Sequence, residues 1–189
     1  DEIWNYNFAR NIAKGLKPYE DISMVQTPFA AYLAAVFLSV FGDTVIVFRI
    51  LGAILAVGVF SFTYYVAKQV HQDWLMPFAL CSFLALFNML AWIYNYNNLN
   101  LLLVILLMYL QYKKAGGAQG KWYPVIEGLV FGMTPIIKQN TGVFIFGVGV
   151  GFCLYAYIKR KNRTEAITQF CSSVCPGILY VSYLFVSGT

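Results

Sequence analysis

The stretch from Leu75 to Tyr112 contains no Asp, Glu, Lys, Arg or His. A soluble domain has roughly 25% charged residues because its surface must stay hydrated. This chain has 11% charged and 60% apolar residues, and at 189 residues it is too short to enclose such a stretch in a soluble core. A lipid bilayer accommodates the stretch as helices with satisfied backbone hydrogen bonds. We therefore expect an all-α membrane protein, a polytopic bundle of transmembrane helices.

The basic residues give the chain a net charge of +5, and they lie mainly in short clusters between apolar runs. Clusters of this kind are typical of cytoplasmic loops under the positive-inside rule. No basic face is large enough to follow a phosphate backbone, so we do not expect nucleic acid as a partner. The four cysteines lie in apolar runs without metal-ligand spacing and are interpreted as buried thiols.

Three regions follow from the apolar pattern. Residues 1–28 form an outer-face loop with an interfacial amphipathic helix, because Trp4, Phe8, Ile12 and Leu16 recur every four residues. Residues 28–41 are too few to cross a bilayer, which takes about 20 helical residues, so they form a short juxtamembrane helix. Residues 45–187 contain about six transmembrane helices, predicted at 45–67, 75–93, 99–112, 123–137, 141–158 and 167–187.

The charges of the loops predict the topology. If residues 28–41 do not cross, the loops at 68–74, 113–122 and 159–166 share one side and hold eight of the 13 basic residues. The other side receives residues 1–27, Asp43 after the short helix, the turn at 95–98 and the turn at 138–140, with five of the eight acidic residues. We therefore expect a multi-pass protein of the plasma membrane whose site faces outward. Within the bundle, Gly147 and Gly151 predict a face for close helix packing.

Polar groups gather at the predicted outer face and are the candidates for a site. A carboxylate, carboxamides and a lysine that meet at one membrane face could bind and transform a substrate. Each group also has a purely structural explanation. A carboxylate is favoured at a helix N-terminus, carboxamides are common in turns, and a lysine near the membrane surface can extend its ammonium to the lipid headgroups. The candidates are Asp1 and Glu2, Asn95 and Asn97, and Lys138 and Gln139.

The order of several motifs resembles the first outer loop of the GT-C membrane glycosyltransferases. The likeness is to the family 39 branch, which contains protein O-mannosyltransferases and the lipid A aminoarabinose transferase. It spans roughly residues 1–145. The motifs are Asp1-Glu2, Asn7-Phe8-Ala9-Arg10 with Gly15, Pro18-Tyr19 with Asp21, Thr27-Pro28-Phe29, Phe41-Gly42, Phe48-Arg49, and Gly128-Leu129-Val130-Phe131-Gly132 running into Thr134-Pro135-Ile136-Ile137-Lys138.

This resemblance implies an inverting transferase that moves a sugar from a polyprenyl-phosphate donor to an acceptor hydroxyl at the outer face. The acidic pair maps onto Asp1 as general base, with Glu2 beside it. Arg10 and Lys138 are the candidates to stabilise the departing phosphate, and Asn95, Asn97 and Gln139 are further substrate-binding candidates. The resemblance does not decide whether a divalent metal binds, and it implies no other cofactor. The partners that it implies are the lipid-linked sugar and the bilayer.

The chain departs from the branch at one motif. Many members have Lys-Pro-Pro ahead of the short helix, where this chain has Gln26-Thr27-Pro28 and so lacks the lysine that would contact phosphate. We also expect the first transmembrane helix of the family to precede Asp1, and this piece to be inactive alone.

Two other classes of function use the same polar groups. A transporter or flippase would bind a lipid-linked or small polar solute with them, and a non-catalytic membrane subunit would have them for structure only. An apolar helix of about 20 residues directly before Asp1 would favour the transferase. An extensive inverted repeat in the full reading frame would favour the transporter.

Overall fold

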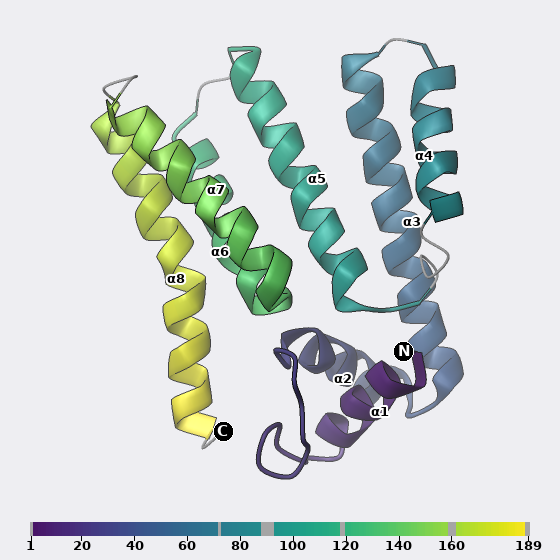
Figure 1. Cartoon of the computed structure of the whole chain (residues 1–189). Helices are drawn as coiled ribbons and strands as arrows, with labels where there is room; N and C mark the ends of the chain where they lie inside the picture. The colour runs from purple at the N-terminus through teal and green to yellow at the C-terminus, as the bar shows by residue number, and fades with distance from the viewer. Residues whose placement is uncertain (1, 72, 88–92, 118–119, 159–161, 188–189) are drawn as a thin grey trace. The chain divides into compact units, whose positions relative to one another are not determined.

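The computed structural model describes residues 2–71, 73–87, 93–117, 120–158 and 162–187 (Figure 1). These residues form eight helices and no strand, which confirms the predicted all-α class. The helices are α1 (Glu2–Ala13), α2 (Phe29–Phe41), α3 (Val45–Val70), α4 (Leu75–Phe87), α5 (Tyr96–Ala115), α6 (Trp122–Ile137), α7 (Gln139–Ile158) and α8 (Arg163–Ser187).

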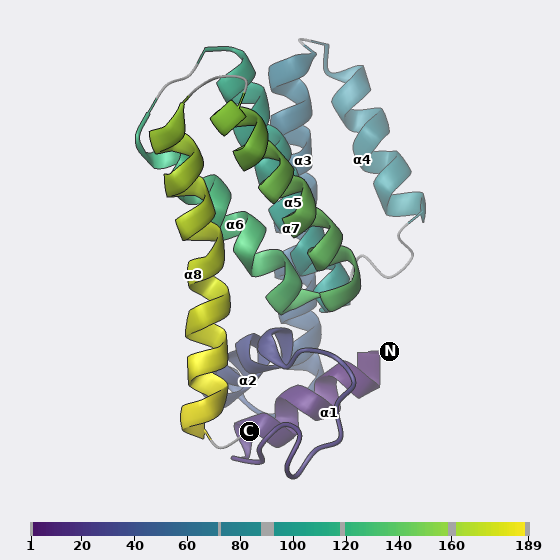
Figure 2. The ribbon, with the colours of Figure 1, turned by 60° about the vertical axis from the view of Figure 1, so that its left-hand side comes forward.

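The chain divides into two compact units. The first unit is Asp1–Ser23 with Pro28–Ile105, and the second is Met24–Thr27 with Leu106–Thr189. In the first unit α1 packs on α2, and α2 and α4 each pack on α3. In the second unit α6, α7 and α8 all pack on one another. Figures 1 and 2 show α3 beside α4 and α6 beside α8 from two directions.

Three helices in the described residues are long and apolar enough to cross a membrane, judged by length and composition. They are Val45–Val70, Gln139–Ile158 and Arg163–Val186. Three shorter apolar helices are Phe29–Phe41, Leu75–Ala85 and Trp122–Ile137. Large apolar side chains stay exposed on the long helices, as Phe144 and Phe185 do at 81% and 82%. Such exposure is expected of surfaces that face lipid.

The amphipathic N-terminal helix forms, but its buried face differs from the predicted stripe. Tyr6, Phe8 and Ala9 are buried, whereas Trp4 and Leu16 are 45% and 42% exposed. Leu16 lies beyond the end of α1, because Gly15 turns the chain with a φ of +91°. The packing against α2 therefore selects Tyr6 and Ala9, which the four-residue repeat of large apolar side chains does not contain.

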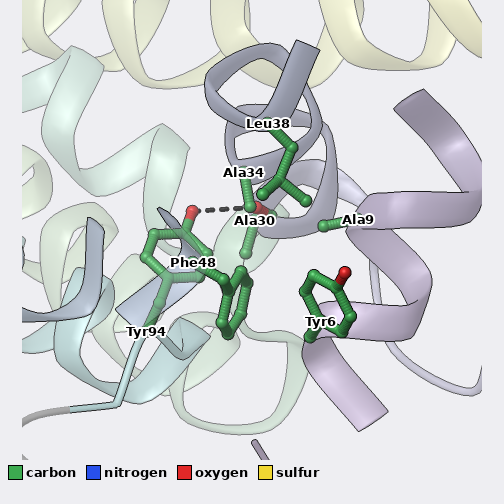
Figure 3. Close-up of a cluster of buried hydrophobic side chains, with 7 residues drawn as sticks. All are labelled: Tyr6, Ala9, Ala30, Ala34, Leu38, Phe48 and Tyr94. Atoms are coloured by element: carbon green, nitrogen blue, oxygen red, sulfur yellow. Dashed lines mark hydrogen bonds between the residues drawn. The ribbon is translucent and has the colours of Figure 1, made fainter. Parts of the chain in front are cut away.

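A small core holds α1, α2 and α3 together in the first unit (Figure 3). Alanines on α2, among them Ala30 and Ala34, let neighbouring elements approach closely. The Phe48 ring is completely buried, and its centroid lies 5.7 Å from that of Tyr6 and 5.5 Å from that of Tyr94. The Tyr94 hydroxyl donates to the Ala30 carbonyl at 2.8 Å. This core fixes the start of α3 and the turn that precedes α5.

Close helix packing in the second unit occurs at Gly128 and Gly132 of α6, which face α8. A Cβ at Gly132 would lie 2.9 Å from the Ser173 carbonyl carbon. The predicted packing face is at Gly147 and Gly151, but a Cβ at either would meet no atom of the described chain within 4 Å. The close approaches of α7 to α6 are instead at Gly142 and Gly149, where a Cβ would lie 2.5 Å from Pro135 Cα and 2.6 Å from Phe131 Cγ. The predicted helix is therefore right and the predicted face is wrong, because sequence shows which glycines share a face but not which face meets a neighbour.

Candidate active site

An ion pair anchors the start of α1 to α3. The Arg49 guanidinium donates to both carboxylate oxygens of Glu2, from Nε at 2.7 Å and from a terminal nitrogen at 3.1 Å. Arg49 lies in the second turn of α3, and Thr44 begins this helix by accepting a hydrogen bond from the Val47 amide at 3.3 Å. The hydrogen bonds from Arg49 lower the pKa of Glu2. Glu2 is therefore held ionised, in a fixed position and already paired.

A second ion pair ties the last turn of α1 to the turn between α2 and α3. Arg10 donates from Nε to Asp43 at 2.9 Å, and the Lys14 ammonium lies 3.5 Å from the same carboxylate oxygen. The Tyr6 hydroxyl donates to the other oxygen of Asp43 at 3.1 Å. Hydrogen bonding from Arg10, then from Tyr6, lowers the pKa of Asp43. Residues 2, 6 and 10 are spaced four apart and form one stripe of α1, and Lys14 follows directly after the end of the helix.

The predicted asparagine turn lies at the start of α5. Asn95 is buried, and its side-chain oxygen accepts from the Asn98 amide at 2.9 Å, which is an N-terminal cap. The Asn98 side chain donates to the Ile93 carbonyl at 3.1 Å. Asn97, by contrast, is exposed. Asn95 thus has a structural role in the turn, one of the two explanations that the sequence allowed. Asn97 is the residue of this turn that is accessible to a ligand.

Lys138 and Gln139 belong to the second unit, where they join α6 to α7. The Lys138 amide donates to the Thr134 carbonyl at 3.0 Å, and its carbonyl accepts from the Gly142 amide at 2.8 Å. Thr134 is buried and donates to the Phe131 carbonyl at 2.8 Å. Thr27 reaches the same turn and donates to the Ile137 carbonyl at 3.2 Å. The turn that presents Lys138 is therefore held by backbone and threonine hydrogen bonds.

Gln139 lies at the edge of an apolar cavity of about 680 Å³ in the second unit. Thr27, Pro135 and Phe146 contribute to the same cavity, whose remaining lining comes largely from α8. A glutamine beside an apolar lining can orient a ligand that has both a polar group and a hydrocarbon part.

The structure brings some predicted site residues into one unit. Glu2, Arg10, Asn95 and Asn97 all belong to the first unit. Asp1, the predicted base, lies outside the described residues. Within the described residues no group of three or more His, Cys, Asp or Glu side chains is arranged to hold a metal ion, so metal binding stays a prediction.

Sequence reasoning missed the partners of two predicted residues. Arg49 pairs with Glu2, and Asp43 pairs with Arg10. In both pairs the two residues are far apart in the chain. The sequence does contain a signal that Arg49 has a partner, because an arginine in the first turns of an apolar helix is energetically costly unless it is paired.

A buried charge cluster in the second unit was missed as well. Glu127 of α6 is completely buried, and the Lys114 ammonium donates to it at 3.0 Å. Lys114 also pairs with Glu165 of α8. Glu127 is the single acidic residue of an otherwise apolar segment, and that exception could have revealed it.

Comparison with known proteins identifies the class. Residues 25–185 match the family described as dolichyl-phosphate-mannose-protein mannosyltransferase, which is most of the chain. The chain belongs to this family of membrane glycosyltransferases. No curated protein and no solved structure matches the chain.

Proposed function

We propose that the protein transfers a sugar from a polyprenyl-phosphate donor to an acceptor hydroxyl at the outer face of the membrane, with inversion at the anomeric carbon. The family supports a lipid-phosphate sugar as donor, since its description names dolichyl-phosphate mannose and a protein acceptor. The observation that carries the proposal within this chain is the Glu2–Arg49 pair, which fixes the helix start next to Asp1.

Asp1 is the proposed general base. Its carboxylate accepts the proton of the acceptor hydroxyl while the oxygen attacks the anomeric carbon. The bond between that carbon and the lipid phosphate oxygen breaks, and the phosphate leaves with the electron pair. Glu2 is a poor candidate for the base because the hydrogen bonds from Arg49 lower its pKa and occupy both oxygens. We assign Glu2 a positioning role, in which its ion pair orients the first turn of α1.

The departing phosphate needs cationic stabilisation, and we assign it first to Lys138. Arg10 is the second candidate, but Asp43 already balances its charge. Asn97 and Gln139 are exposed and are proposed to contact the donor or the acceptor. Asn95 is proposed to act through the turn that presents Asn97.

The test is transfer from a polyprenyl-phosphate sugar by purified, reconstituted full-length protein. Asp1→Asn keeps the shape of the side chain but removes the base, so we expect turnover to fall by roughly 10²–10⁴-fold. Asp73→Asn is the matched control, since Asp73 is exposed and lies in a loop predicted on the opposite membrane side; it should leave turnover unchanged. Near-normal turnover of the Asp1→Asn variant would exclude Asp1 as the base.

A further inference from the structure

The second unit has a large excess of positive charge at one end. Its sequence contains eight basic residues and two acidic ones, Glu127 and Glu165. Seven of the eight basic residues lie in two short stretches, 113–121 and 159–163, which contain the end of α5 and the start of α8. Both carboxylates pair with one ammonium group, that of Lys114. Two carboxylates cannot neutralise seven cations, so this end of the unit is strongly basic.

Three described cations at this end lie outside those ion pairs. Lys121 directly precedes α6, Arg163 begins α8, and both are exposed. Lys113 is partly exposed in the last turn of α5. Among the residues that the structure describes, none of the three forms an ion pair. Residues 159–161 lie outside the described residues, and because all three are basic they add to the excess of positive charge.

Aromatic side chains accompany these cations. The Arg163 guanidinium lies 5.6 Å from the centre of the Tyr157 ring, and the Lys113 ammonium lies 5.6 Å from the centre of the Tyr109 ring. Trp122, the first residue of α6, is 74% exposed. Tyrosine and tryptophan are enriched where a membrane protein passes from hydrocarbon to water, and their rings attract cations. This combination is typical of the level of the lipid headgroups.

Exposed apolar side chains begin about one turn away from the cations. On α8, Ile167 is exposed four residues after Arg163. On α5, Met108 is exposed five residues before Lys113. With a rise of 1.5 Å per residue, the cations lie about 6–8 Å along the helix from these apolar side chains. A lipid whose chains cover the apolar surface would therefore have its phosphate at the level of the cations.

A cavity of about 830 Å³ opens at this end, which is within the size range of small-molecule sites. Lys121 lines it from the start of α6, and Thr164 lines it from the first turn of α8. An ammonium and a hydroxyl both donate hydrogen bonds to phosphate oxygens. Glu165 lines the same cavity, where Lys114 offsets its charge and the Asn162 amide donates to it at 2.7 Å. The phosphate contacts are therefore available from Lys121 and Thr164.

We propose that this end of the second unit binds an anionic phospholipid, whose phosphate occupies the cavity beside Lys121 and Thr164. Arg163 and Lys113 attract the same negative charge from the rim, as basic residues do beside transmembrane helices. A zwitterionic lipid fits less well, because its choline or ethanolamine cation adds to the positive charge already present. The site is separate from the sugar-transfer site and does not depend on the proposed reaction.

The experiment measures binding to the purified full-length protein in an uncharged detergent by microscale thermophoresis. The probes are short-chain phosphatidylglycerol, phosphatidylcholine of the same chain length, and glycerol 3-phosphate. We expect phosphatidylcholine to bind about 30-fold more weakly than phosphatidylglycerol, since Lys121 and Arg163 each contribute about 1 kcal/mol to the attraction of an anionic lipid. Glycerol 3-phosphate has a phosphate but no acyl chains, so it should bind more weakly than the anionic lipid.

Two variants and a matched control test the site itself. Lys121→Gln should weaken phosphatidylglycerol about fivefold. Thr164→Val should weaken it about tenfold, the factor for one hydrogen bond to a charged group, although the charge of the protein is unchanged. Lys17→Gln is the control, because Lys17 is equally charged but belongs to the first unit, where it pairs with Glu20. Lys121 and Thr164 are both exposed, so each variant tests the site even if the other does not fold.

Four results would overturn the proposal. They are equal affinity of the unmodified protein for the two lipids, glycerol 3-phosphate that binds as tightly as phosphatidylglycerol, phosphatidylglycerol binding that Lys121→Gln and Thr164→Val leave unchanged, and a loss with Lys17→Gln as large as that with Lys121→Gln. The second result would identify a soluble anion as the ligand, and the last would identify a general attraction of charge. None of these measurements depends on sugar transfer, so their outcome is independent of the proposed function.

Discussion

Replacing Gly132 with alanine should destabilise the contact between α6 and α8. A Cβ at this position would lie 2.9 Å from the Ser173 carbonyl carbon and 3.1 Å from Pro176 Cδ. Carbon atoms of this kind pack at about 3.5–4.0 Å, so one helix must move by several tenths of an ångström. The obstructing atoms belong to the backbone and to a proline ring, and neither can rotate away. Overpacking of this kind costs about 1–3 kcal/mol.

Gly147→Ala is the matched control for this prediction. It is also a glycine inside an apolar helix, but its added Cβ meets no atom of the described chain within 4 Å. Alanine is favoured over glycine in a helix by up to about 1 kcal/mol, so this variant should be neutral or slightly more stable. The two variants therefore separate a packing effect from a general effect of helix propensity.

The assay is thermal unfolding of the purified protein in detergent, followed by the loss of helical circular dichroism. We expect a lower midpoint for Gly132→Ala and an unchanged or higher midpoint for Gly147→Ala. Gly128→Ala should behave like Gly132→Ala, because a Cβ there would lie 2.6 Å from Ser172 Cβ. Equal midpoints for Gly132→Ala and the unmodified protein would refute the close approach of α6 and α8.

Two further predictions concern pH and topology. Because Arg10 lowers the pKa of Asp43 below its ordinary value of 3.8, the carboxylate stabilises the fold above that pH and loses this contribution as the pH falls through the folded-state pKa. The difference in unfolding midpoint between the unmodified protein and Asp43→Asn should therefore be present at pH 6 and shrink below pH 3.8; a difference that does not change with pH would contradict this. With the native cysteines removed, single cysteines at Asn97 and Gln139 should react with an impermeant thiol reagent from outside, while those at Gly117 and Asn162 should need permeabilisation. Labelling of Gly117 in intact cells would overturn the topology.

The sequence by itself determined the class of protein and the places of the helices. Long apolar runs without charge exclude a soluble fold, and the polar breaks between them mark the helix ends. Residues 123–137 were predicted as one segment, and α6 is Trp122–Ile137. Residues 28–41 were predicted as a short helix, and α2 is Phe29–Phe41, between Pro28 and Gly42. Membership of the glycosyltransferase family also follows from residues alone, since the motifs and the family match both depend on sequence.

The tertiary structure decided which residues meet. Nothing local pairs Glu2 with Arg49, because the two are 47 positions apart and are joined only when α1 lies against α3. The partly buried Lys114 ammonium likewise pairs with carboxylates from two other helices. Helix formation depends on neighbours within about four residues, whereas ion pairs and close glycine contacts depend on how whole helices pack. For that reason the apolar pattern predicted α6 and α7, but not that Gly132 of α6 and Gly149 of α7, rather than Gly147, are points of close approach.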